Sequence, residues 1–189
     1  SKFKAEELFN KYHSKVPFVK QLMNEIMKAA ANKGQIKTLL NRRCRFPKYE
    51  PILRGSDWGK YVPAEDQERM EDLQKMGAYL KNDEGELLKD KDGNPKKNYW
   101  HNNPTRRAFT YKALNKLIQG SAADMTKKAM LDLYKEGIIP HIQIHDELDL
   151  SVEDDKHAQK IKDVMESAVD LKIPNKVDYE SGPNWGSIK

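Results

Sequence analysis

The chain has 189 residues, 33% of them charged, and a formal net charge of +5, which is compatible with a polyanionic partner but does not identify one. Its single cysteine excludes an internal disulfide and a four-thiolate metal site, and it favours a reducing intracellular compartment. No apolar run approaches the ~20 residues needed to cross a bilayer, so we expect no membrane partner.

The first 47 residues are predicted to form two helices and a hairpin. Apolar side chains recur at helical spacing over residues 3–32, and Pro17 breaks this run where we expect the first turn of a second helix. Ser14 is the expected N-cap of that helix, and Gly34 is its expected end. Residues 35–47 then alternate around an Asn-Arg-Arg sequence, which predicts a short hairpin.

Residues 48–104 differ from the rest in their many glycines, prolines and charges, and we interpret them as a surface insertion. One helix is predicted over residues 64–80. Turn sequences at residues 82–85 and 90–94 are expected to flank a small hairpin. The second turn sequence is similar to the start of a calcium-binding loop, but it lacks the glycine and the glutamate that such a loop needs, so we reject that site.

Three aromatic residues lie near the C-terminal end of this insertion. Tyr99, Trp100 and His101 follow Lys96 and Lys97, and aromatic rings beside cations can stack on the bases of a single strand. The alternative is an aromatic lid over the core of the insertion, and we favour this second interpretation.

The last 85 residues are predicted to alternate helices with strands. A long helix is expected over residues 105–136, followed by a hairpin over residues 138–152. A helix over residues 154–171 and a strand over residues 176–181 complete the series. This order indicates an α+β fold with an antiparallel sheet.

The turn of the later hairpin carries the most informative residues. His145, Asp146 and Glu147 lie between two apolar strands, and neighbouring carboxylates repel each other unless a cation lies near. Carboxylates at such a turn can hold Mg²⁺ together with substrate phosphates, and two such ions suit in-line phosphoryl transfer. The alternative is a solvated acidic turn without a metal. If these three residues had no further context, we would favour this alternative, because short motifs often occur by chance.

The helix before this hairpin carries two amides on one face. Asn115 and Gln119 are four residues apart, so their side chains lie together. Amides can donate hydrogen bonds to the acceptors that every base pair shows in the minor groove. The alternative is that they cap neighbouring loops.

Four landmarks together resemble the C-terminal part of the family A (polymerase I-type) DNA polymerases. The family's Asn-x-x-x-Gln-Gly-Ser/Thr-Ala-Ala-Asp helix and its Gln-Val-His-Asp-Glu-Leu hairpin, called motif C, each have a close counterpart here. The family's Leu-x-Gly-Arg-Arg hairpin and its C-terminal Gly-x-Asn-Trp sequence also have close counterparts in this chain. The matching segments, in the family's order, are residues 39–47, 115–124, 143–148 and 182–185.

The resemblance implies three parts. Residues 1–47 would be the end of the fingers, residues 48–104 an insertion like those of some phage members, and residues 105–189 the fingers-to-palm helix and the palm. It also implies a place in the cytoplasm of a bacterial or phage-infected cell.

The resemblance also implies residue roles. Asp146 would bind catalytic Mg²⁺, Glu147 would support the metal site, and His145 would lie near the primer terminus. Many relatives have an arginine one turn before the asparagine, whereas this chain has Tyr111 beside Lys112. The DNA-binding residues implied are Arg42, Arg43, Tyr111, Lys112, Asn115, Gln119 and Gln143.

Two parts of the family's active site are absent from this sequence. We find neither the motif A aspartate nor the nucleotide-binding helix, so the two-metal site needs a further aspartate. The expected partners are therefore primer-template DNA, a dNTP and an N-terminal polymerase segment, encoded by the same gene or as a split subunit. The leading hypothesis is DNA-directed DNA synthesis. The alternatives are an accessory DNA-binding module and a Mg²⁺-dependent nuclease using Asp146, Glu147 and Asp149.

Overall fold

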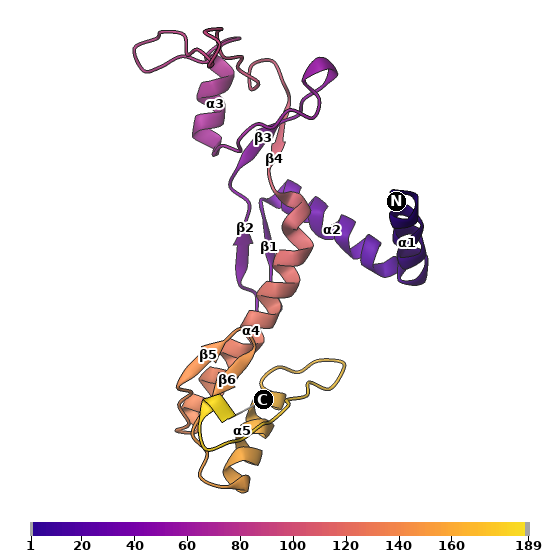
Figure 1. The fold of residues 1–189 in the computed structure, drawn as a ribbon, viewed down its shortest axis with the longest axis vertical. Coiled ribbons are helices and arrows are strands. Elements are labelled where there is room, and N and C mark those ends of the chain that lie inside the picture. The colour runs from indigo at the N-terminus through magenta and orange to yellow at the C-terminus, as the bar shows by residue number, and fades with distance from the viewer. Residues whose placement is uncertain (1, 188–189) are drawn as a thin grey trace. The chain divides into compact units, whose positions relative to one another are not determined.

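The computed structural model describes residues 2–187, which divide into two compact units. Unit 1 comprises Ser1–Lys37 and Arg42–Leu117, and unit 2 comprises Thr38–Asn41 and Ile118–Lys189. Five α-helices and three two-stranded antiparallel sheets lie within the described residues, which confirms the α+β class (Figure 1). Every helix between residues 2 and 187 is too short or too polar to span a bilayer.

Unit 1 begins with two helices, α1 (Lys2–Lys15) and α2 (Pro17–Lys33). Pro17 occupies the first turn of α2, as predicted, because its missing N–H is not needed there. The predicted cap is wrong: Val16 is the N-cap and makes no side-chain cap bond. The Ser14 hydroxyl instead donates to a carbonyl of the preceding helical turn.

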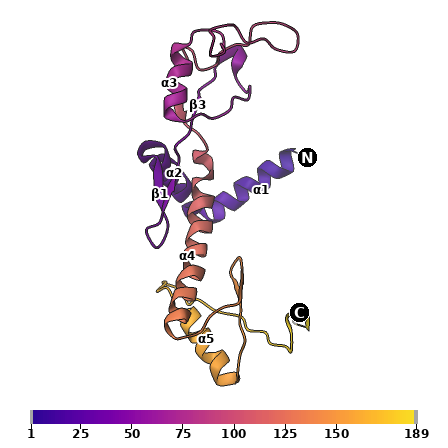
Figure 2. The same ribbon diagram turned by 90° about the vertical axis from the view of Figure 1, so that its left-hand side faces the viewer.

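A small core joins α2 to the first hairpin. The predicted hairpin is confirmed as β1 (Gln35–Lys37) paired with β2 (Arg43–Arg45), and α2 lies beside it (Figure 2). Because side chains alternate across a strand, the hairpin turns one apolar face inward. The buried side chains of this core are Ala30, Ile36, Phe46 and Ala113.

Gly34 ends α2 in the left-handed region, at a φ of 66°. A Cβ at this position would lie 2.7 Å from the Arg107 guanidinium carbon. We expect Gly34→Ala to lower the free energy of unfolding by about 1–2 kcal/mol from backbone strain. A further loss is expected because shifting the Arg107 guanidinium strains the 3.0 Å hydrogen bond that it donates to the Phe46 carbonyl. Urea denaturation will measure the loss. Gly55→Ala is the matched control, because Gly55 has a similar φ of 60° but open space around its Cα. Equal losses in the two variants would show that the approach of Arg107 adds nothing.

The insertion contains one helix, α3 (Gln67–Lys75), which is shorter than predicted. Asp66 begins it by accepting a hydrogen bond from the Arg69 backbone N–H at 2.9 Å. The two predicted turns are confirmed at Gly85 and Gly93, which both take a positive φ.

The insertion has a small core of its own. Met70, Leu73 and Trp100 are buried together, and Asn98 fastens the segment by donating to the Leu73 carbonyl at 2.6 Å. Trp100 is only 4% exposed, so it cannot stack on a nucleic-acid base, and the lid interpretation is confirmed for this residue. The three-part division of the chain stays a prediction.

The long helix predicted from residue 105 starts later. Thr105–Arg107 forms β4, which pairs antiparallel with β3 (Tyr49–Pro51). A 3-10 turn, Thr110–Lys112, then leads into α4 (Ala113–Lys135). Residues 105–107 form a strand instead of a helix because their backbone hydrogen bonds are made with β3, more than 50 residues earlier in the chain.

Unit 2 contains most of α4 and the elements after it. These are β5 (Ile142–Ile144), β6 (Glu147–Asp149), α5 (Asp155–Ser167) and a final 3-10 turn, Trp185–Ser187. The predicted strand at residues 176–181 is wrong, because its backbone has no paired strand among the described residues. Instead the Val177 N–H donates to the Glu166 carboxylate at 3.0 Å.

Candidate functional site

The β5–β6 hairpin forms the tight turn that the sequence predicts. Ile144 lies opposite Glu147, so only His145 and Asp146 form the loop between the strands. His145 has a φ of 53°, which is uncommon for a residue with a side chain, although histidine tolerates it better than most. The Gln143 side-chain amide donates to the His145 carbonyl and so holds this loop.

The acidic side chains of the turn are available to a ligand. Asp146 and Glu147 are both exposed, and neither forms a hydrogen bond or ion pair within residues 2–187. Asp149 lies two residues beyond Glu147 on the same face of β6, and its Oδ2 is buried without a hydrogen-bond partner in the described structure. Exposed carboxylate oxygens are the ligands that Mg²⁺ prefers, so Asp146 and Glu147 fit part of a magnesium site.

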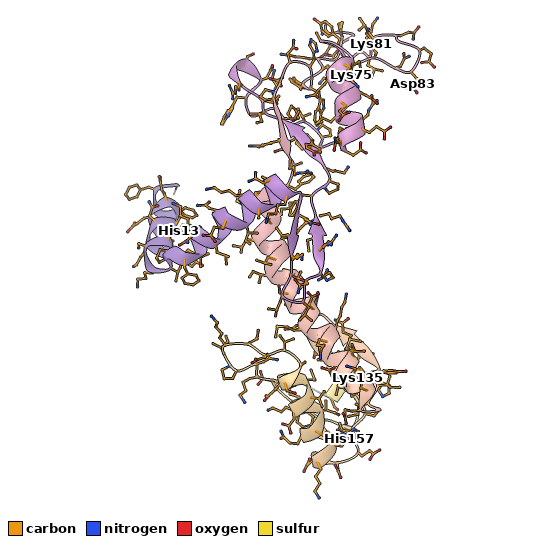
Figure 3. The ribbon with its side chains drawn as sticks, turned by 180° about the vertical axis from the view of Figure 1, so that it is seen from behind. His13, Lys75, Lys81, Asp83, Lys135 and His157 are labelled. Carbon is orange, nitrogen blue, oxygen red and sulfur yellow. The ribbon has the colours of Figure 1, made fainter. Side chains whose placement is uncertain are left out.

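The set of ligands is incomplete within the described residues. No group of three or more histidine, cysteine or acidic side chains converges on one point between residues 2 and 187. His13 lies on α1 and His157 on α5, in different units (Figure 3). The hairpin therefore offers two exposed carboxylates and needs at least one further ligand from elsewhere.

The predicted amide face of α4 is solvent-exposed. Asn115 and Gln119 are both exposed, and neither amide caps a loop in the described structure. Tyr111 precedes them in the 3-10 turn with 64% of its surface exposed. The Lys112 ammonium lies 5.6 Å from the centre of the Tyr111 ring. These groups remain accessible to a partner.

The first hairpin concentrates positive charge. Lys37 lies directly opposite Arg43, and Arg45 follows on the same exposed face. Like charges facing each other across a sheet are destabilising unless an anion lies between them. Arg42, in the loop, is also exposed.

Asp124 and Ser121, both on α4, have a role that sequence reasoning missed. Asp124 and Thr38 are each 5% exposed, and the Thr38 hydroxyl donates to the Asp124 carboxylate. Beside them the Leu39 N–H donates to the Ser121 hydroxyl at 3.0 Å. These bonds fix the tip of the first hairpin, Thr38–Asn41, within unit 2. A carboxylate among the small residues of a helix was the only available signal.

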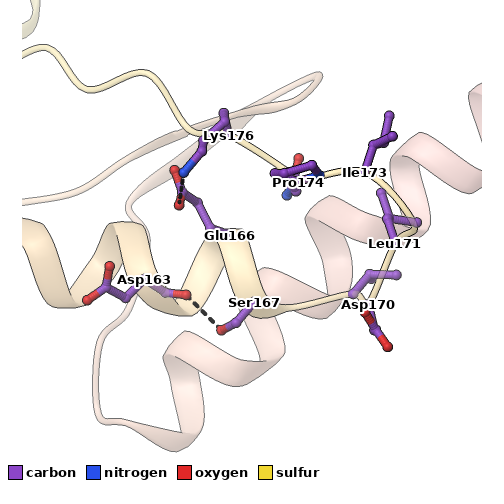
Figure 4. A pocket seen from close by; sticks show the side chains of 10 residues that line it. Asp163, Glu166, Ser167, Asp170, Leu171, Ile173, Pro174 and Lys176 are labelled. Carbon is purple, nitrogen blue, oxygen red and sulfur yellow. Dashed lines mark hydrogen bonds and ion pairs between the residues drawn. The ribbon is translucent and has the colours of Figure 1, made fainter.

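A pocket of about 450 Å³ lies at the end of α5 (Figure 4). Its polar groups serve the fold: Glu166 accepts from the Val177 N–H, and its carboxylate lies 3.4 Å from the Lys176 ammonium. The Val177 N–H, followed by Lys176, lowers the pKa of Glu166. The Ser167 hydroxyl donates to the Asp163 carbonyl at 2.7 Å. The pocket therefore marks where the chain turns back onto α5.

Comparisons with known proteins agree with the landmarks. A family model described as "DNA polymerase family A" matches residues 1–187. The chain is 33% identical over 182 residues to a DNA-directed DNA polymerase of Pseudomonas phage M6, and the match covers 96% of this chain and 19% of that protein. It is 31% identical over 195 residues to DNA polymerase I of Geobacillus stearothermophilus, covering 98% of this chain and 17% of that protein.

A solved structure shares the fold. The chain is similar to the POL domain of Pol1 from M. smegmatis, a structure that contains DNA primer-template and dNTP, with a TM-score of 0.61 and 21% identity. The match covers 100% of this chain and 26% of that one. The chain thus spans less than a fifth of the two curated relatives and about a quarter of the solved domain.

Proposed function

This chain belongs to the family A DNA polymerases, and from that membership we propose that it supplies one part of an active site for template-directed DNA synthesis. The observation that carries the proposal is the β5–β6 turn. It presents Asp146 and Glu147 with exposed carboxylates that no described residue neutralises. Mg²⁺ is usually held by one or two carboxylates together with substrate phosphates, and this turn offers two carboxylates.

In the proposed reaction the primer 3′-hydroxyl attacks the α-phosphate of a dNTP and pyrophosphate leaves. Asp146 would hold Mg²⁺, with Glu147 supporting the metal site. When bound, two such ions activate the attacking oxygen and stabilise the leaving group. His145, next to Asp146 in the loop, is the residue we assign to the primer terminus.

We assign the positioning of the duplex to the amide face of α4. Asn115 and Gln119 would donate to minor-groove acceptors common to all base pairs, which checks shape without reading sequence. Tyr111, Lys112, Arg42 and Arg43 would add contacts to the DNA, and Gln143 would act mainly by holding the loop that carries His145.

We further propose that this chain acts together with an N-terminal polymerase segment. That segment would supply the remaining carboxylate, because no third ligand converges within residues 2–187. It would also cover apolar side chains that are otherwise costly to expose, since each large one is worth roughly 1.5–3 kcal/mol when buried. The exposed apolar side chains on α1 and α2, each with more than half of its surface exposed, are Phe3, Leu8, Phe9, Tyr12 and Phe18.

A complementation assay tests this proposal. The chain is mixed with, or fused to, a family A segment that ends before these residues, and extension of a labelled primer is measured with Mg²⁺. We expect extension only when both parts are present. No extension from any combination, with both parts folded, would count against the assignment.

The second candidate function is an accessory DNA-binding module, which the cationic first hairpin favours. We expect Lys37→Ala with Arg43→Ala to weaken duplex binding by the chain. The slope of log K against log salt should fall by about 1.8, since each lost phosphate contact accounts for roughly 0.9. Fluorescence anisotropy at several salt concentrations will measure this change.

The control removes the same charge elsewhere. Lys89→Ala with Lys91→Ala changes two exposed lysines of the insertion and should leave the slope unchanged. If the two double variants had equal slopes of log K against log salt, the first hairpin would not be part of the DNA interface. The nuclease hypothesis would need Asp146, Glu147 and Asp149 to converge, and no three acidic side chains do so within residues 2–187.

A further inference from the structure

Residues 53–61 of the insertion form an aromatic loop. Trp58 is 80% exposed and Tyr61 is 88% exposed, whereas Trp100 of the same unit is only 4% exposed. Gly55 and Gly59 take positive φ values of 60° and 80°, which allows the chain to turn tightly on both sides of Trp58. Two large rings therefore face solvent on one short loop, while the core of the insertion is built from other residues.

Cations gather beside this loop. The Asp57 carboxylate accepts hydrogen bonds from Lys60, at 2.8 Å, and from Lys97. Both ammonium groups lie 5.6 Å from the centre of the Tyr99 ring. The bond from Lys60, followed by that from Lys97, lowers the pKa of Asp57, while the bond to Asp57 raises the pKa of Lys60. Asp57 thus holds two cations and a third ring together next to Trp58.

The excess of positive charge is confined to the surroundings of the aromatic loop and does not extend over the whole insertion. Residues 48–104 contain twelve acidic and ten basic side chains, so the insertion as a whole does not attract a polyanion. Around the aromatic loop the balance reverses, because Arg54, Lys60 and Lys97 outnumber Asp57. An apolar protein partner would gain nothing from these cations, whereas a nucleic-acid strand needs both rings and cations.

We propose that the aromatic loop, with Lys60 and Lys97, binds single-stranded DNA. Trp58 and Tyr61 would stack on bases, and the two lysines would meet the phosphates. Stacking tolerates every base because each has a flat face, and the basic side chains follow the backbone, which is how single strands are bound without sequence preference. The inference rests on the proposed function only in taking DNA as the strand that this protein meets.

A local fluorescence assay tests the proposal on the full chain. Trp185→Phe leaves Trp58 as the only exposed tryptophan, because Trp100 is buried. We expect a dT20 oligonucleotide to quench this fluorescence, and an abasic sugar–phosphate oligomer of the same length to quench it much less. Trp58→Ala with Tyr61→Ala should weaken binding of labelled dT20 at least tenfold, as measured by anisotropy, whereas Trp58→Phe with Tyr61→Phe should retain most of the affinity.

Tyr134→Ala is the matched control, since Tyr134 is a 66% exposed ring in unit 2, away from any of these lysines in sequence. Unchanged dT20 affinity in the double alanine variant, absence of quenching, or an equal loss in Tyr134→Ala would each overturn the proposal. The assay needs no catalysis, so failure of primer extension in the complementation experiment would leave its outcome standing.

Discussion

Asp146→Ala is expected to lower the rate of primer extension by about 10²–10³-fold in the complemented enzyme, which is the usual effect of removing one group that stabilises charge in a transition state. The carboxylate stands in the two-residue loop between β5 and β6, exposed and without a described ion-pair partner. Its removal therefore changes no packing. Single-turnover extension with a radiolabelled primer will measure the rate, and binding of the primer-template should change little.

Two further variants make this result specific. Asp146→Asn keeps the shape of the side chain but loses its charge, so we expect a loss close to that of alanine. Glu153→Ala removes another exposed carboxylate of unit 2, outside the turn, and should extend at the normal rate. Normal extension by Asp146→Ala would refute the metal-binding role, and a slow Glu153→Ala would point to a general effect of charge.

Asp124→Ala is expected to lower the free energy of unfolding by about 1.5–3 kcal/mol, because it leaves the buried Thr38 hydroxyl without its charged partner. The tip of the first hairpin depends on this bond and on the nearby Leu39–Ser121 bond. A hydrogen bond to a charged group contributes more to stability than one between two neutral groups. Urea denaturation followed by circular dichroism will measure the change.

A double-mutant cycle separates this pair from the rest of unit 2. Thr38→Val together with Asp124→Ala should lose less than the sum of the two single variants, because the bond between these two side chains can be lost only once. Asp178→Ala removes an exposed carboxylate of the same unit and should change stability by less than about 0.5 kcal/mol. Strict additivity in the cycle would show that the two side chains do not stabilise each other.

Features that depend on near neighbours follow from local sequence. Pro17 starts α2 and Gly34 ends it, because a missing N–H and a positive φ are properties of single residues. The turn at His145 and Asp146 is equally local, since two apolar runs separated by two polar residues leave little choice of register. The family, too, was predictable, because its landmarks are short runs of adjacent residues in a set order.

Features that depend on distant partners could not be predicted, because their causes lie far away in the sequence. Residues 105–107 read locally as helix but form β4, since β3 supplies hydrogen bonds across more than 50 residues. The bond between Thr38 and Asp124 joins residues 86 positions apart, and the burial of Trp100 depends on α3. Residues 176–181 read as a strand but stay irregular, because strand propensity has no effect without a neighbouring strand to pair with.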